Sequence, residues 1–310
     1  MSSIGAELTT PGAGRPRARR FRLRGTLVPL LFFIPPALFL FVTFVMLPMV
    51  DAAHFSFFNW TGYGPVTDFV GFRNYWEVLT HRNFGTSVRN SLIVVAVSLC
   101  IQLPLALWCA IALAERSVST MLTRMLFFLP YMLAEVAAAL IFKFLYDGNN
   151  GLVPAVGHLL GVHFPFILGD KFWVIPAIML VVVWKYFGFY MMIYIAGLQA
   201  IPSEVIEAAR LDGARKWQIV WFIKIPMIWS AIAITIFFSM TGALQFFDMI
   251  IPLSNGGPSN TSHSIVSFLY QFGIVRLKIG FGSAVSVLLF IASVVVAVLY
   301  RGATARLESD

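Results

Sequence analysis

The sequence predicts an all-α polytopic membrane protein with six transmembrane helices. Hydrophobic residues make up 59% of its 310 residues and charged residues only 12%, whereas soluble proteins carry about 25% charged residues. The mean hydropathy is +0.84, and apolar stretches near the roughly 20 residues that a spanning helix needs recur along the chain. This composition excludes a soluble enzyme, a disulfide-stapled secreted domain and a disordered scaffold.

The first 25 residues form a polar, basic segment ahead of the first apolar stretch. Its basic residues are Arg15, Arg17, Arg19, Arg20, Arg22 and Arg24. We expect residues 1–25 to be a disordered cytoplasmic tail that sets orientation and engages anionic lipid. The stretch Leu27–Val50 is too long for a signal-peptide core and no small-residue cleavage site follows it, so it is predicted to be a retained first span. The pair Pro35–Pro36 predicts a kink or local unwinding in this span.

Five further spans complete a single membrane domain over residues 26–310. They are expected at Leu92–Ala114, Met125–Phe144, Phe172–Ala196, Pro226–Phe247 and Phe281–Tyr300. The apolar segment 265–275 is too short to span and predicts a half-helix or a surface element.

The distribution of Lys and Arg predicts the orientation. With the N-terminus inside, fourteen of the 22 basic residues fall in cytoplasmic segments and six in outer segments. Cytoplasmic segments of membrane proteins are enriched in Lys and Arg. We therefore expect both termini, and residues 199–225, to face the cytoplasm.

The connection between the fourth and fifth spans predicts a helix-turn-helix. Pro202 suits the start of a helix, and Glu204 complements its positive N-terminal end. Gly213 can end this helix in a left-handed conformation, a second short helix restarts at Ala214, and Pro226 opens the fifth span. An ordinary loop helix would show the same pattern.

The residues of this connection resemble the EAA motif of binding-protein-dependent ABC importers. The resemblance rests on Glu207-Ala208-Ala209, Gly213 four residues later and Ile223-Lys224-Ile225-Pro226, with Ile225 where the family has Leu. It extends from the first span to the last and is greatest for the first permease subunit of the maltose and glycerol-phosphate type. Two stretches support it, Asn255-Gly256-Gly257-Pro258 with Thr261, and Phe69-Val-Gly-Phe-Arg-Asn-Tyr.

The resemblance implies the permease subunit of a type I importer in a bacterial cytoplasmic (inner) membrane. A second homologous permease, two cytosolic ATPase subunits and an extracytoplasmic solute-binding protein would be its partners. The chain itself would be no enzyme and hold no cofactor or metal, because ATP would bind the partner subunits; no phosphate-binding glycine loop occurs in the sequence. ATPase coupling would fall to Glu204, Glu207, Ala208, Ala209, Asp212, Gly213 and Pro226, and the receptor-facing loop to Asn255, Gly256, Gly257 and Pro258.

A sugar is the expected substrate, with a polyol phosphate left open. The alternative function is an ion-coupled secondary transporter of a small polar solute, which would require an inverted repeat or paired broken helices with buried carboxylates. A membrane-embedded enzyme is a third possibility, but the sequence shows no nucleophile, base or metal spacing.

Polar and aromatic residues inside the spans predict the substrate pathway, because ionisable groups in hydrocarbon are costly and functional by default. The candidates are Tyr131, Glu135, Tyr186, Ser239 and Gln245. Aromatic faces with neighbouring hydrogen-bonding groups suit a sugar. Purely structural roles are the alternative for some of the polar residues. Lys143 and Asp248 could extend from span ends to the membrane surface, and Lys185 and Glu135 could form a buried pair. The five histidines fall in outer segments without metal-like spacing, and His158 and His163 are expected on the surface.

Overall fold

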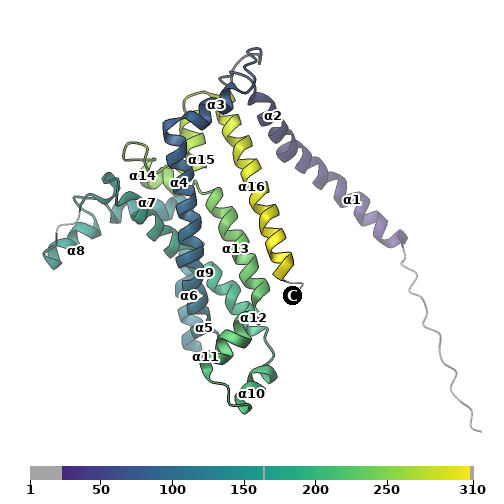
Figure 1. Cartoon of the computed structure of the whole chain (residues 1–310), viewed down its shortest axis with the longest axis vertical. Coiled ribbons are helices and arrows are strands. Elements are labelled where there is room, and N and C mark those ends of the chain that lie inside the picture. The colour runs from purple at the N-terminus through teal and green to yellow at the C-terminus, as the bar shows by residue number, and fades with distance from the viewer. Residues whose placement is uncertain (1–22, 163–164, 308–310) are drawn as a thin grey trace, which may run out of the picture. The chain divides into compact units, whose positions relative to one another are not determined.

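The computed structural model describes residues 23–162 and 165–307. The chain divides into two units, which meet between Val50 and Asp51, and each is described by itself (Figure 1). Regular structure in the described ranges is helical, apart from an isolated antiparallel bridge between Phe58 and Phe69. The all-α prediction is therefore confirmed.

The α-helices follow one another closely along the chain. They are α1 (Leu23–Phe41), α2 (Leu47–Phe55), α3 (Arg73–Thr80), α4 (Arg82–Val97), α5 (Leu103–Leu113), α6 (Val118–Met132), α7 (Glu135–Leu145), α8 (Leu152–Leu160), α9 (Val174–Gln199), α10 (Ser203–Leu211), α11 (Lys216–Ile219), α12 (Ile225–Met227), α13 (Trp229–Leu244), α14 (Ile250–Ser254), α15 (Ile265–Phe268) and α16 (Ile279–Leu307). Short π-helical turns join several of them, namely η1 (Val42–Met46), η2 (Ser98–Gln102), η4 (Val220–Lys224) and η5 (Leu269–Ile274), and a 3₁₀ turn, η3 (Ile167–Gly169), precedes α9.

Six spans are present when each bent helix pair counts as one. Four helices are long and apolar enough to cross a membrane, namely Phe32–Phe55, Arg82–Leu113, Val174–Gln199 and Ile279–Ala305. Two further spans are broken: α6 and α7 meet at 96°, and Lys216–Met227 meets α13 at 67°. The apolar helix Ile265–Ile274 is too short to span, as predicted for residues 265–275.

The first unit contains α1 and η1, and α2 continues from it. Residues 1–22 of the predicted tail lie outside the described residues, and residue 23 already begins α1. Of the kink or local unwinding expected at Pro35–Pro36, the unwinding is wrong, because α1 is continuous through the pair. An unwound segment would leave additional backbone groups unpaired in hydrocarbon, which costs more than the two hydrogen bonds that the prolines remove.

Three of the π-helical turns end just before a proline. In each, the residue preceding the proline donates its N–H to the carbonyl five residues earlier: Leu47 to Val42, Leu103 to Ser98 and Ile225 to Val220. The prolines are Pro48, Pro104 and Pro226. A proline ring clashes with the carbonyl four residues before it. A widened turn moves that carbonyl aside while the helix continues.

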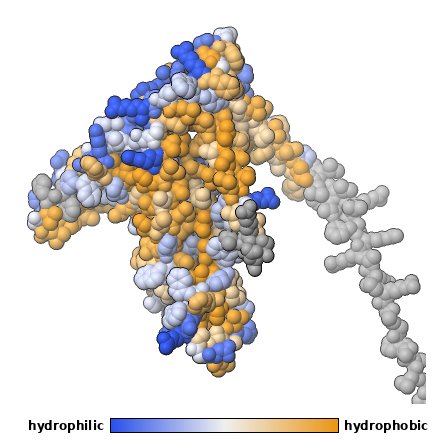
Figure 2. Space-filling view, in the orientation of Figure 1, coloured by the Kyte–Doolittle hydropathy of each residue, from blue (hydrophilic) through white to orange (hydrophobic). Residues whose placement is uncertain are grey.

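Helix α9 lies at the centre of the second unit. It packs against α5 and α6, and also against α4, α7 and α13. Gly188 allows the close contact with α6, because a Cβ at this position would lie 2.0 Å from the carbonyl oxygen of Phe127. Figure 2 shows a broad hydrophobic surface over the middle of this unit, with hydrophilic residues gathered at the end that carries α3 and at the end that carries α10. This is the surface of a protein whose middle faces lipid.

The third span is broken where sequence analysis expected one helix over Met125–Phe144. The backbone is extended at Leu133 and Ala134, between α6 and α7. Lys185 of α9, only 1% exposed, donates from Nζ to the carbonyls of Leu133 at 2.6 Å, Tyr131 at 3.4 Å and Pro130 at 3.5 Å. An ammonium group thus satisfies carbonyls that the break leaves without helical partners.

The fifth span is also interrupted, one residue after α12. The backbone at Ile228 (φ −99°, ψ 17°) leaves helical geometry before α13 begins at Trp229. Helix α13 ends at Leu244 rather than Phe247. The start of the predicted fifth span at Pro226 therefore belongs to a short helix of its own.

Candidate functional site

A cavity of about 310 Å³ lies among α4, η2, α6, α7, α9, α13 and the segment that follows α13. All five residues predicted for the substrate pathway line it: Tyr131, Glu135, Tyr186, Ser239 and Gln245. The remaining lining residues are Val94, Ser98, Gln102, Val182, Phe189, Tyr190, Phe238, Gly242, Ala243, Phe246, Phe247 and Asp248. Its volume is at the lower end of the range for small-molecule sites, about 300–1,000 Å³.

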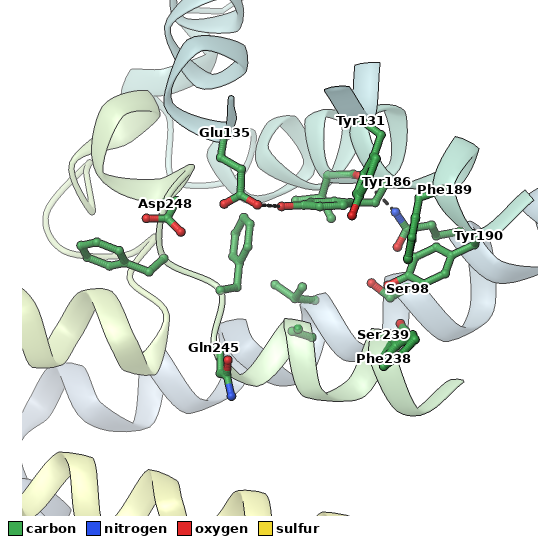
Figure 3. Close-up of a pocket in the computed structure, with 17 residues that line it drawn as sticks. Ser98, Tyr131, Glu135, Tyr186, Phe189, Tyr190, Phe238, Ser239, Gln245 and Asp248 are labelled. Atoms are coloured by element: carbon green, nitrogen blue, oxygen red, sulfur yellow. Dashed lines mark hydrogen bonds between the residues drawn. The ribbon is translucent and has the colours of Figure 1, made fainter. Parts of the chain in front are cut away.

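Glu135 and two tyrosines form one wall of the cavity. The Tyr186 hydroxyl donates a hydrogen bond to the Glu135 carboxylate (Figure 3). The Tyr131 ring stacks on Phe189, with centroids 4.6 Å apart and planes 16° from parallel. Glu135 begins α7 directly after the break, so the 96° bend directs both Tyr131 and Glu135 into one cavity.

The predicted pair of Lys185 and Glu135 does not form. Lys185 bonds to backbone carbonyls and Glu135 to a phenol, and the ion pair found within the described residues joins Arg73 and Glu77. Lys185 Nζ lies 5.4 Å from the centre of the Tyr186 ring and 5.9 Å from that of Tyr131. Lys185 therefore makes cation–π contacts with these two rings and does not itself line the cavity.

Ser239 supplies a hydroxyl to the opposite wall. It is 2% exposed, and its Oγ has no hydrogen-bond partner among the described residues. The Tyr190 side chain, which also lines the cavity, lies next to this hydroxyl. Buried hydroxyls are nearly always bonded, so the two groups together offer hydrogen-bonding capacity at this wall. Gln245 also lines the cavity, although its amide points away from Tyr186 in Figure 3.

Sequence reasoning missed several lining residues. Ser98 and Gln102 lie on the π-helical turn η2, and the Gln102 amide donates to the carbonyl of Val182 at 3.0 Å. Asp248 and Lys143 were both expected at the ends of spans. Asp248 does follow the end of α13, and it also lines the cavity. Lys143 is exposed in the last turn of α7. A proline two residues after Gln102 is the one sequence signal for the turn that carries it.

The predicted coupling segment forms the expected helix-turn-helix. Helix α10 contains Glu204, Glu207, Ala208 and Ala209, and none of its residues is buried. After Asp212, Gly213 is left-handed (φ +83°) and Ala214 donates its N–H to the carbonyl of Ala209 at 2.9 Å. Helix α11 begins at Lys216 rather than Ala214, because Arg215 is the extended N-cap residue and its N–H bonds to Gln218.

The predicted receptor loop is tightly folded rather than loose. Asn255 and Gly256 are left-handed, and the peptide bond before Pro258 is cis. Gly256 lies against the imidazole of His263, where a Cβ would be 2.0 Å from Cε1. The Asn90 amide of α4 donates to the carbonyls of Thr261 at 2.7 Å and His263 at 2.9 Å. These bonds tie the loop to α4.

The histidines occupy different environments. His158 is exposed, as expected, while His163 lies outside the described residues. His263 is fully buried and bonds Ser267 at 3.1 Å, which nothing in its spacing indicated. His81 packs edge-on against Phe268 and Phe272.

A second pocket, of about 280 Å³, has His81 in its wall together with Arg276 and Lys278. Burial, and then the charges of Arg276 and Lys278, lower the pKa of His81. Elsewhere outside the spans, the backbone N–H groups of Asn150 and Asn149 lower the pKa of Asp147, whose carboxylate closes the turn after α7.

Comparison with known proteins relates this geometry to one family. Residues 102–309 match the model of the binding-protein-dependent transport system inner membrane component. The chain is 33% identical over 270 residues to the multiple sugar-binding transport system permease protein MsmF of Streptococcus mutans, covering 86% of this chain and 92% of the relative. It is 30% identical over 300 residues to the diacetylchitobiose uptake permease NgcF of Streptomyces coelicolor, covering 92% and 84%.

A solved structure has the same fold. A chain of the bacterial alginate ABC transporter, crystallised with its alginate pentasaccharide-bound periplasmic protein, superposes with a TM-score of 0.81 at 21% identity, over 94% of this chain and 98% of that chain. At this identity the likeness shows the fold alone. The family match and the permease relatives show a multi-pass protein of the cytoplasmic membrane, with ATP hydrolysis on another subunit. The chain belongs to the family of binding-protein-dependent transport system inner membrane components.

Proposed function

We propose that this chain forms one half of the translocation pathway of an ATP-driven sugar importer, and that the cavity beside Glu135 is where the sugar passes. One observation carries the proposal: residues from three broken or widened helices (η2, the α6–α7 break and the end of α13) converge on a single cavity. The relatives named for sugar uptake support the choice of substrate. An ion-coupled mechanism receives no support from this family.

The chemistry of the cavity suits a sugar. The stacked Tyr131 and Phe189 rings offer faces for C–H groups, while Glu135, Asp248 and the Ser239 hydroxyl offer acceptors to sugar hydroxyls. Sites for small solutes combine an apolar lining with a few placed polar groups in this way.

Coupling to ATP hydrolysis is assigned to α10 and the turn after it. The helix has no buried residue, and Leu211 at its C-terminal end is 89% exposed. A short helix that projects from the protein with charged Glu207 and an exposed leucine is suited to enter a cleft of an ATPase subunit. The turn at Gly213 then links it through α11 and η4 to α13.

The remaining partners and the orientation complete the proposal. Two cytosolic ATPases, a second permease and a solute-binding protein are the proposed partners, and the loop Asn255–Pro258 faces the binding protein. Both termini and α10 face the cytoplasm, because of the distribution of Lys and Arg.

The pathway can be tested by removing one phenol hydroxyl from the cavity. In the complete complex reconstituted in proteoliposomes, Tyr186→Phe should lower sugar uptake about two- to twelvefold, the effect of one hydrogen bond of about 0.5–1.5 kcal/mol. Tyr146→Phe is the matched control, since its hydroxyl also bonds, to the carbonyl of Ala177 at 3.2 Å, but outside the cavity. Equal uptake by the two variants would contradict the assignment.

A further inference from the structure

We propose that the cavity admits a polyhydroxylated solute only if that solute carries no negative charge, so that uronic acids and polyol phosphates are rejected by the permease itself. This inference rests on the proposed function, because it assigns the substrate class of the same cavity.

The charged groups that line the cavity have one sign. Among the described residues, its charged lining side chains are Glu135 and Asp248, both carboxylates. Glu135 is half-buried and Asp248 is exposed at the cavity. An anion entering would meet these two like charges and no cation in the lining.

The nearest basic side chain, Lys185, interacts with Glu135 through space but offsets only one of the two negative charges. Lys185 bonds the carbonyls of Leu133 and Tyr131, is 1% exposed and does not line the cavity. The rings of Tyr131 and Tyr186 lie beside its ammonium group, with centroids 5.9 and 5.4 Å from Nζ. An incoming phosphate or carboxylate therefore finds no donor cation on this side of the pathway.

The hydroxyl of Ser239 adds a second observation in favour of a polar ligand. It is buried in the cavity wall beside Tyr190, and within the described residues no hydrogen bond of good geometry occupies it. In Figure 3 it lies with Ser98 at one end of the cavity, while Glu135 and Asp248 lie at the other. Carboxylates accept hydrogen bonds and donate none. The site is therefore arranged for a solute that donates from several hydroxyl groups.

The sign of the field can be measured without knowing the sugar. Gly242 lines the cavity, and a Cβ there meets no atom within 4 Å, so Gly242→Cys places a thiol in open space. Cys100 and Cys109 are replaced by alanine. The complete complex is then treated with a cationic and an anionic thiosulfonate reagent of similar size, and both rates are normalised to those of a small free thiol.

The cationic reagent is expected to react at least about tenfold faster, because each carboxylate attracts the cationic reagent and repels the anionic one. The double change Glu135→Gln with Asp248→Asn should lower that ratio at least threefold. Glu115→Gln, which removes an exposed carboxylate outside the cavity, should leave it unchanged. Equal rates for the two reagents, or a ratio that survives the double change, would overturn the inference.

A protection assay tests the ligand class directly. Among glucose, maltose, trehalose and raffinose, at least one should slow the labelling of Gly242→Cys, whereas glucuronate and glycerol 3-phosphate should not. Protection by either anion, or by none of the neutral sugars, would overturn the inference. A failure of the proposed pathway would give a different result. If the sugar does not pass through this cavity, the complex with labelled Gly242→Cys would take up sugar at the unlabelled rate, whatever the ratio of the cationic to the anionic labelling rate.

Discussion

Lys185 shows how one residue can determine the course of a span. Its ammonium group lies fully inside the second unit and bonds the carbonyls of Leu133 and Tyr131 at the end of α6. The C-terminal end of a helix carries partial negative charge, which a cation complements. The break that it supports directs Tyr131 and Glu135 into the cavity, so a residue that does not line the site still determines the shape of the site.

Removing this cation should destabilise the protein. Lys185→Met leaves buried carbonyls without a donor, at a cost of about 1–3 kcal/mol, and should lower the thermal unfolding midpoint of the detergent-solubilised chain. Lys143→Met is the control, because Lys143 is exposed in the last turn of α7. A midpoint for Lys185→Met equal to that of the control would show that the carbonyls are satisfied in another way.

His81 makes stability depend on pH. It packs against Phe268 and Phe272, and burial together with Arg276 and Lys278 lowers its pKa. An unfolded histidine gains a proton below about pH 6.5, while the folded one resists protonation. Stability should therefore be constant above about pH 7 and decrease as pH falls below about 6.5. This is checked by thermal unfolding of the wild type and His81→Gln between pH 8 and 5.5. The unfolding midpoint should fall less with pH in His81→Gln than in the wild type. The control His158→Gln, at an exposed position, should show the same fall as the wild type.

At the scale of elements, irregular helices build the site. The α6–α7 break, the π-helical turn η2 and the early end of α13 each contribute lining residues. All six spans were predictable from the sequence, because apolar length is a strong signal. The breaks were not predictable, because they depend on contacts between residues distant in sequence, such as that of Lys185 with α6. The prolines at 48, 104 and 226 were a local signal for three of the widened turns.

The turn after α10 gives a prediction at this scale. Gly213 is left-handed at φ +83°, and a Cβ there would meet no atom within 4 Å. The penalty for a side chain is therefore conformational, about 1 kcal/mol, and folding should survive. Gly213→Asp and Glu207→Lys are expected to insert and bind the receptor normally but to lose substrate-stimulated ATP hydrolysis in the reconstituted complex. Gly302→Asp, in an open position on α16, is the control. Normal stimulation in both test variants would refute the coupling role.

For the whole molecule, the distribution of Lys and Arg predicts an orientation in the membrane. Hydrophobic residues cover the middle of the second unit, and hydrophilic residues cover its two ends (Figure 2). The convergence of five polar or aromatic residues on one cavity was predictable, because polar groups inside apolar spans are rare. Phe189, Phe238 and Tyr190 were not identified as lining residues, since aromatic residues in a span fit lipid, core and cavity equally well.

The orientation is tested with reporter fusions. Fusions after Arg116 and Arg215 should report a cytoplasmic location, and fusions near Gly151 and Ser259 an outer one, because the basic residues concentrate on the first side. Reversal at either pair would contradict the six-span topology.

The widened turn η2 also affects how the chain tolerates changes in length. An ordinary helix advances 100° per residue, and η2 contains one residue more per turn than its neighbours α4 and α5. Deleting one residue there would allow a continuous α-helix without loss of the hydrogen-bond ladder. It would change the facing of α4 relative to α5 only slightly, because the wide turn uses about one more residue to complete the same rotation. Deleting one residue of α4 between Asn90 and η2 would instead rotate Asn90 by about 100° and turn it away from the loop at Thr261. In this span, η2 is therefore the place where a change in length by one residue is compatible with correct facing of the side chains.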